Sequence, residues 1–277
     1  MAPAPRERAV DIYLIGRGIL GLRQLTAEAR EALRSCRLVF DLSGDAAAIR
    51  RVNRNVVDLS DDYWGHSDLN ANIYERLTRK VLAEGARGPT VGLVTDGHPM
   101  VFDDVCWAIR RRGKKRGLNV VALPGVSCLD TMVIDLWVDL GNGSQIVEAN
   151  QLVEWNMTLS PHLATFVFQV GKFGTEIIGA PKSTSRKGRY DALAEHLMRW
   201  FPPTHPVTLI VSAGDVRPAA RRSVRLGMLD RARAFIDENA PYGLTLFLPA
   251  LPSTPDLAFG TRIRDHEHHA DIAGRKS

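Results

Sequence analysis

The sequence predicts an α/β protein built from two α/β domains, and two observations carry that prediction. Up to about residue 125, short apolar runs typical of buried strands alternate with helix-like segments, which is the pattern of a parallel sheet covered on both faces. Beyond residue 126, strand-like runs dominate, which indicates a mixed sheet. We therefore expect an N-terminal domain over 1–125, a C-terminal domain over 126–264 and a flexible tail over 265–277.

The first domain is expected to alternate strands and helices from its start. Thr26 is a favourable N-cap, and Glu28 places an acidic side chain in the first turn of the helix that follows. The polar stretch 59–66 is expected to form a loop before the long helix at 70–83. The expected order is strand 12–15, a helix after Thr26, strand 38–40, helix 46–51, helix 70–83, strand 91–95, helix 103–112 and strand 119–123.

The second domain is expected to begin with a helix and to continue mainly with strands. The apolar run 164–170 is the longest of these strands, and the amphipathic pattern of 190–200 predicts a helix after it. The expected order is helix 128–136, strand 146–149, strand 164–170, helix 190–200, strand 207–211 and strand 244–248.

Three of the strands in the first domain end in glycine turns. The turns are Gly16-Arg17-Gly18, Asp96-Gly97-His98-Pro99 and Pro124-Gly125-Val126-Ser127. Glycine turns at the carboxyl ends of parallel strands let the backbone approach a nucleotide-like ligand closely. The chain is therefore expected to bind such a ligand.

The first turn also matches a dinucleotide-binding fingerprint. The run 16–21 has the glycine spacing of that motif, and Asp41 follows it at about the expected distance of roughly 20 residues. In that motif, however, the last glycine lies inside a helix that starts at once, whereas here the better helix start is Thr26 and 22–25 is expected to be a loop. Dinucleotide binding is therefore the less favoured alternative.

The composition is that of a globular protein with a sizeable core. The chain has 277 residues, of which 45% are hydrophobic and 24% charged. No segment approaches the roughly 20 apolar residues that a bilayer span needs, so we expect a cytoplasmic protein with no membrane partner. Cys36, Cys106 and Cys128 are far apart and odd in number, which favours buried free thiols over disulfides or a zinc site.

The charged segments do not predict a nucleic-acid or metal site. The net charge of +5 is moderate, and the basic run 110–116 suits the carboxyl end of a helix and lacks interleaved aromatic residues. We therefore do not favour a nucleic-acid partner. The histidine cluster at 266–269 lies near the chain end, where a polar tail is the better interpretation, and no metal site is expected.

Taken in order, these segments resemble a known family. The resemblance rests on 12–18 with Leu25-Thr26 after it, on the turn 96–102 and on the turn 124–127. On these residues the chain resembles the tetrapyrrole methylase family of S-adenosylmethionine-dependent methyltransferases. The resemblance implies two α/β domains with S-adenosylmethionine in the cleft between them.

Within that family the chain is more similar to the peptide backbone α-N-methyltransferases of borosin biosynthesis. The segments that carry this likeness are 139–152, 168–174 and the tyrosine-bearing stretch 63–74. The likeness implies a precursor peptide as substrate and a homodimer. Because few residues follow the last expected strand, we expect the precursor peptide to be a separate chain.

Methylation of a backbone amide makes specific chemical demands, because the nitrogen lone pair is delocalised into the carbonyl group. The reaction needs a base near the N–H and donors aimed at the carbonyl oxygen. Tyr63, in the expected loop, and Tyr74, on the expected helix, match the family positions assigned to this work. The cofactor contacts implied by the resemblance are Gly16, Gly18, Asp96, His98, Pro99, Val101, Phe102, Ser127, Cys128, Gln169 and Val170.

One expected catalytic residue departs from the family pattern. An arginine is expected one helical turn before Tyr74, and this chain has Asn70 there, so oxyanion stabilisation is weakened unless Arg76, His66 or His98 compensates. Three functions therefore stay open: a peptide N-methyltransferase, a methylase of the same fold acting on a tetrapyrrole or RNA, and a catalytically silent cofactor-binding member. Ordinary structural roles also stay open, such as an apolar helix stripe for Tyr74.

Overall fold

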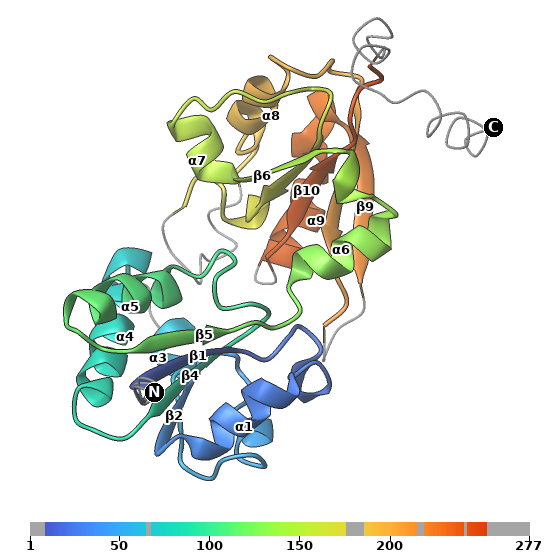
Figure 1. Ribbon diagram of the computed structural model, residues 1–277. Coiled ribbons are helices and arrows are strands. Elements are labelled where there is room, and N and C mark those ends of the chain that lie inside the picture. The colour runs from blue at the N-terminus through green and yellow to red at the C-terminus, as the bar shows by residue number, and fades with distance from the viewer. Residues whose placement is uncertain (1–8, 65–67, 176–185, 215–218, 241–242, 254–277) are drawn as a thin grey trace, which may run out of the picture.

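The computed structural model describes residues 9–64, 68–175, 186–214, 219–240 and 243–253. Within these ranges the chain forms two five-stranded sheets, one in each half of the molecule (Figure 1). The first sheet has the order β3-β2-β4-β1-β5, and all its pairings are parallel, which confirms the α/β prediction. Its strands are β1 (Ile12–Gly16), β2 (Leu38–Asp41), β3 (Val56–Asp58), β4 (Val91–Thr95) and β5 (Val120–Leu123).

Helices cover both faces of the first sheet. On one face Leu14 and Leu93 pack in one cluster with Ile73 of α4 and Ile109 of α5. On the other face Ile15 packs with Leu33 of α1. Strands buried on both faces need apolar side chains at nearly every position, which explains their continuous apolar runs. The helices of this half are α1 (Ala27–Ser35), α2 (Ala46–Ile49), α3 (Ser60–Trp64), α4 (Asn70–Gly85) and α5 (Asp104–Lys115).

The start of α1 confirms the cap predicted at Thr26. The Thr26 hydroxyl accepts a hydrogen bond from the Ala29 backbone N–H at 3.1 Å. The stretch before it contains only a short 3-10 turn, η1 (Gly21–Arg23), so Gly21 does not lie inside a helix as a dinucleotide site would require. This arrangement counts against dinucleotide binding.

The loop predicted around Tyr63 is wrong, because this residue lies in the short helix α3. Asp58 accepts a hydrogen bond from the Ser60 backbone N–H at 2.9 Å, and Asp61 and Asp62 lie in the first turn, where acidic side chains favour a helix. The same polar residues had suggested a loop. The short strand β3 before them was also missed.

The second sheet is mixed, as predicted. Its order is β6-β7-β10-β8-β9, with β6 parallel to β7 and the other pairings antiparallel. One face packs on α7, α8 and α9, and α6 covers the other through Met132. The elements are α6 (Cys128–Leu136), β6 (Ser144–Glu148), α7 (Ala149–Glu154), β7 (Ala164–Phe168), α8 (Asp191–Leu197), β8 (Pro206–Val211), β9 (Ala220–Arg225), α9 (Arg233–Asn239) and β10 (Thr245–Leu248), with 3-10 turns η2 (Leu140–Asn142), η3 (Val170–Lys172) and η5 (Leu226–Ala232).

Two expectations for the second half are wrong. The strand predicted over 164–170 ends at Phe168, because Gln169 has a left-handed backbone with φ +57° and Val170 begins η3. The edge strand β9 and helix α9 were missed, since β9 carries exposed arginine side chains in place of an apolar run. In the described ranges, no helix has the length and apolar character needed to cross a membrane.

The N-cap of α5 supports a prediction about stability. Asp103 accepts a hydrogen bond from the Cys106 backbone N–H at 2.8 Å, and burial raises the pKa of Asp103 from 3.8 to about 6. An acid whose pKa is raised in the folded state stabilises the fold most below its unfolded pKa, and this contribution is lost as pH rises to about 6. Asparagine caps equally well but does not ionise.

We therefore expect Asp103→Asn to make the protein more stable than the wild type by about 2 kcal/mol at about pH 7.5 and by much less at about pH 4. Urea unfolding at the two pH values measures the difference. A benefit of equal size at both pH values would mean that ionisation of Asp103 is not the cause.

Candidate functional site

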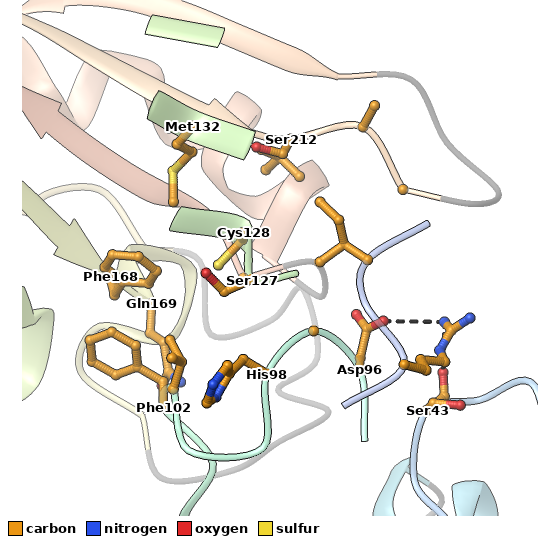
Figure 2. Close-up of a pocket in the computed structure, with 18 of the residues that line it drawn as sticks. Ser43, Asp96, His98, Phe102, Ser127, Cys128, Met132, Phe168, Gln169 and Ser212 are labelled. Atoms are coloured by element: carbon orange, nitrogen blue, oxygen red, sulfur yellow. Dashed lines mark hydrogen bonds and ion pairs between the residues drawn. The ribbon is translucent and has the colours of Figure 1, made fainter. Parts of the chain in front are cut away.

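A cavity of about 630 Å³ lies between the two sheets. That volume is within the range of small-molecule sites, roughly 300–1,000 Å³. Its walls come from the turns after β1, β2 and β4, from the start of α6, and from the ends of β7 and β8 (Figure 2). The lining residues are Arg17, Ile19, Ser43, Gly44, Asp45, Asp96, Gly97, His98, Val101, Phe102, Ser127, Cys128, Met132, Phe168, Gln169, Ile210, Val211, Ser212, Ala213, Gly214 and Gly243.

The three glycine turns meet beneath this cavity. A Cβ on Gly16 would lie 2.5 Å from the Gly97 carbonyl oxygen and 2.7 Å from the Gly125 nitrogen. Gly18 and Gly97 also exchange backbone hydrogen bonds, at 3.1 and 3.3 Å. Gly16 and Gly125 therefore have no room for a side chain, because the turns pack on one another.

One end of the cavity is polar and charged. Arg17, whose side chain is only 9% exposed, lies 3.2 Å from Asp96 and 3.6 Å from Asp45 and donates to the Ser43 carbonyl oxygen at 3.3 Å (Figure 2). The fully buried Asp41 accepts hydrogen bonds from Ser43 and from the Asp45 backbone N–H, and it thereby holds the turn after β2. This turn was not expected from the sequence, although polar residues directly after a buried strand are a signal for it.

The other end of the cavity is aromatic. Phe102 and Phe168 stack with their ring centroids 4.4 Å apart, although one follows β4 and the other ends β7. Phe102 and Gln169 both have left-handed backbones, with φ of +53° and +57°. Non-glycine residues adopt that conformation at a cost in free energy, so the surrounding structure must hold the stack between the two halves in place.

The start of α6 forms a third wall. Ser127 caps this helix in a reciprocal arrangement with Asp130, in which the Ser127 backbone N–H donates to the carboxylate at 2.6 Å. Cys128 lines the cavity, and burial raises the pKa of its thiol to about 11, so the thiol is neutral near pH 7. Cys36 and Cys106 are buried free thiols as expected, whereas Cys128 is only half-buried.

His98 lies between the aromatic end and Ser127 in Figure 2. Its Nδ1 accepts a hydrogen bond from the Met100 backbone N–H at 3.0 Å. The Met100 carbonyl oxygen in turn accepts from the Trp107 indole N–H at 3.2 Å. Both backbone groups of Met100 are thus engaged, and the turn after β4 is held in one conformation.

Tyr63 of α3 and Tyr74 of α4 form a stacked pair. Their ring centroids are 6.1 Å apart, and both rings pack with Met100 against the core of the first half. Tyr63 donates a hydrogen bond to the Tyr74 oxygen, which favours ionisation of Tyr74 over that of Tyr63. Burial nevertheless raises the pKa of both phenols above 10, and the charges of Asp103 and Asp104 add to that effect.

The expected compensators for the missing arginine are placed differently. The Arg76 guanidinium donates to the backbone carbonyl oxygen of Asp62 at 3.1 Å and so fastens α3 to α4. His66 lies outside the described residues, as does the histidine cluster at 266–269. The Asn70 side-chain oxygen is buried and has no hydrogen-bond partner among the described residues.

The expected site residues therefore fall into three groups. Seven of the expected cofactor contacts line the cavity: Asp96, His98, Val101, Phe102, Ser127, Cys128 and Gln169. Gly16, Gly18, Pro99 and Val170 are not among the lining residues, and Val170 is fully buried in the second core. Tyr63, Tyr74 and Asn70 also lie outside the lining, but the tyrosines pack against the same core cluster as Met100, which lies two residues after His98.

Several lining residues were not expected from the sequence. Arg17 lies between two glycines, and the motif singles out the glycines and not the residue between them. Met132 has the pattern of an ordinary residue on the core face of α6. The segment 212–214 follows β8, in a half of the chain where no turn motif was recognised. Within the described residues, no group of three His, Cys, Asp or Glu side chains could hold a metal ion.

Comparison with known proteins points in one direction. The model of the family described as Tetrapyrrole (Corrin/Porphyrin) Methylases matches residues 11–216. The chain is 27% identical over 217 residues to the methyltransferase and precursor of the cyclic peptide omphalotin A from Omphalotus olearius, covering 77% of this chain and 51% of that protein. It is 28% identical over 214 residues to a methyltransferase and type III borosin precursor from Anomoporia bombycina, covering 74% and 24%.

The chain spans about half the length, or less, of these curated relatives. Among solved structures, uroporphyrin-III-C-methyltransferase from Thermus thermophilus aligns with a TM-score of 0.59 at 18% identity, covering 88% of this chain and 97% of that one. The methyltransferase CobJ aligns with a TM-score of 0.57 at 14% identity, covering 90% and 97%. At such identities the structural likeness concerns the fold alone.

Proposed function

The chain belongs to the tetrapyrrole (corrin/porphyrin) methylase family, and from that premise we propose that it is an S-adenosylmethionine-dependent methyltransferase acting on backbone amides of a peptide. The observation that carries the peptide substrate is the stacked pair Tyr63 and Tyr74, which packs against the core of the first half. A carbon nucleophile of a tetrapyrrole does not require such a pair. The relatives named as methyltransferases and cyclic-peptide precursors support the same choice.

The lining of the cavity fits S-adenosylmethionine. Asp45 and Asp96 can accept hydrogen bonds from ammonium and ribose hydroxyl groups, Arg17 can bind a carboxylate, and the Phe102–Phe168 stack provides an apolar wall. When bound, this cofactor supplies a methyl carbon made electrophilic by the adjacent sulfonium. The task left to the protein is to position the amide nitrogen and remove its proton.

Tyr74 is the proposed base. The hydrogen bond that Tyr63 donates to the Tyr74 oxygen stabilises the Tyr74 phenolate, so a proton is more readily lost from Tyr74 than from its partner. The raised pKa of Tyr74 means that only a small fraction is ionised near pH 7, but the phenolate that does form is strongly basic. The two rings therefore act as one proton-accepting unit.

We further propose that the protein acts as a homodimer in the cytoplasm. The three free cysteines suit a reducing compartment. At the end of α6, Trp137 is 91% exposed and Ile134 is 67% exposed, which is unusual for apolar side chains of this size. An apolar surface of this kind supports association of two copies through α6.

We expect the double substitution Ile134→Asp with Trp137→Asp to convert a dimer into a monomer in sedimentation velocity. The matched control is Trp155→Asp, which changes a 63% exposed tryptophan after α7 and should leave the dimer intact. A wild-type protein that sediments as a monomer, or a dimer in the α6 double variant, would overturn the interface.

The proposed function is tested by two measurements on the purified protein. Calorimetric titration with S-adenosylmethionine and, separately, with NAD distinguishes the methylase from the dinucleotide alternative. Incubation with S-adenosylmethionine and pooled synthetic peptides of random sequence, followed by fragment mass spectrometry of the peptides and of the protein itself, detects methyl groups on backbone nitrogen. Binding of NAD alone, or methylation confined to side chains, would contradict the proposal.

A further inference from the structure

His98 lines the cavity, and its hydrogen bond to Met100 shows which of its two ring nitrogens carries the proton. The Met100 backbone N–H donates to His98 Nδ1 at 3.0 Å, and a backbone N–H can only donate. Nδ1 must therefore carry its lone pair, and the proton of the neutral ring must lie on Nε2. The ring belongs to the cavity wall, beside Phe102 and Gln169 in Figure 2.

Other polar side chains of the wall are engaged with the protein. Arg17 is held by Asp45 and Asp96, and the Ser127 hydroxyl donates to Asp130 at 2.7 Å. The Ser212 hydroxyl donates to Asp135 at 3.0 Å. Within the described part of the chain, neither His98 Nε2 nor the Gln169 side-chain amide has a hydrogen-bond partner.

His98 and the tyrosine pair are held by the same half of the molecule. The Met100 N–H fixes the imidazole, and Met100, Tyr63 and Tyr74 each pack against the same core cluster. The indole of Trp107 holds the Met100 carbonyl oxygen at 3.2 Å. The N–H donor and the proposed base therefore belong to one half of the molecule and its core, whereas Gln169 belongs to the other half.

We propose that His98 is a catalytic residue whose Nε2–H donates a hydrogen bond to the carbonyl oxygen of the amide being methylated. This inference rests on the proposed function. In the reaction the amide N–H bond breaks and an N–CH3 bond forms. The proton passes to the Tyr74 phenolate and then to water, and the donor sulfur keeps the electron pair of its broken S–CH3 bond.

The charge state of His98 suits this role. As the amide loses its proton, negative charge develops on the carbonyl oxygen, and a donor already in place stabilises that charge. A neutral imidazole does so without adding a second positive charge to a cavity that must accept a sulfonium cation.

The tautomer can be measured directly. In protein labelled with nitrogen-15, long-range correlations between the ring nitrogens and ring protons distinguish the two neutral tautomers, and loss of one signal set in His98→Asn assigns His98 among the eight histidines. We expect a protonated Nε2 and an unprotonated Nδ1. A proton on Nδ1 would overturn the proposal, whatever the activity of the protein.

The catalytic role is tested by single-turnover methylation of the pooled peptides at saturating S-adenosylmethionine. His98→Ala should lower the rate about a hundredfold and change the calorimetric Kd for S-adenosylmethionine less than about threefold. In His98→Asn, the side-chain oxygen can still accept the Met100 N–H, as in an Asx turn, but the amide donor is too short to replace Nε2. A slow His98→Asn therefore supports the proposal, and its recovery to the wild-type rate would reveal a merely structural role.

Gln169→Ala provides the matched comparison, because it removes the other N–H donor without touching the turn after β4. We expect it to lose less rate than His98→Ala, and the reverse order would overturn the assignment. An active wild type with an equally active His98→Ala overturns the role of His98 alone. A wild type that binds S-adenosylmethionine and methylates no peptide overturns the proposed function and this role together.

Discussion

Replacing Tyr74 with phenylalanine should lower the rate of peptide methylation by about a thousandfold while the affinity for S-adenosylmethionine changes less than about threefold. The substitution removes the oxygen that accepts the Tyr63 hydrogen bond and, as proposed, the amide proton, but it keeps the ring that packs against the core of the first half. Tyr74 lies outside the cavity lining, so cofactor contacts stay in place. Single-turnover methylation and calorimetry on the same preparation measure the two quantities.

Two further substitutions sharpen this test. Tyr63→Phe should slow the reaction less than Tyr74→Phe, because it removes only the hydrogen bond that stabilises the Tyr74 phenolate. Tyr13→Phe makes the same chemical change on β1, where the ring packs against the α1 side of the sheet, and it should leave the rate unchanged. Wild-type activity in Tyr74→Phe would rule out Tyr74 as the base.

Much of the first half could be predicted because local chemistry decides it. Thr26 caps α1 through its own hydroxyl, and the doubly buried strands β1 and β4 need continuous apolar runs, so short stretches of sequence carry the signal. Gln169 shows the opposite case. Its run 164–170 looks like one strand, but the chain turns after Phe168, whose ring stacks on Phe102 from the other half. No neighbour in the sequence indicates that contact.

The candidate site shows the same division. Asp96, His98 and Ser127 could be found because each belongs to a recognisable turn, whereas Met132 and Ile210 become cavity walls only when the two sheets are placed together. Arg17 was passed over for a related reason. Its role depends on Asp45, which is brought near by the turn after β2. Residues that act through partners distant in sequence are therefore the ones that sequence analysis misses.

Gly16→Ala should both destabilise the protein and weaken cofactor binding, because Gly16 packs against Gly97 and Gly125 beneath the cavity. The added Cβ would lie 2.5 Å from the Gly97 carbonyl oxygen, 2.7 Å from the Gly125 nitrogen and 2.8 Å from Pro99 Cδ. Two of these three atoms are backbone, so the turns themselves must shift. Overpacking of this kind costs about 1–3 kcal/mol, and each kcal/mol lowers Tm by roughly 2–4 °C in a protein of this size.

The loss of binding should be larger than the loss of stability suggests. The shifted turns carry Arg17, Asp96 and Ser127, which line the cavity, so we expect the Kd for S-adenosylmethionine to rise by more than about tenfold in calorimetry. Gly117→Ala is the control, because Gly117 has φ +73° and open space around its Cβ, and it lies between α5 and β5, outside the cavity lining. That variant should lose about 1–2 kcal/mol of stability from backbone strain and keep its affinity. If Gly16→Ala bound the cofactor as tightly as Gly117→Ala, the contact among the three turns would not be what positions the site.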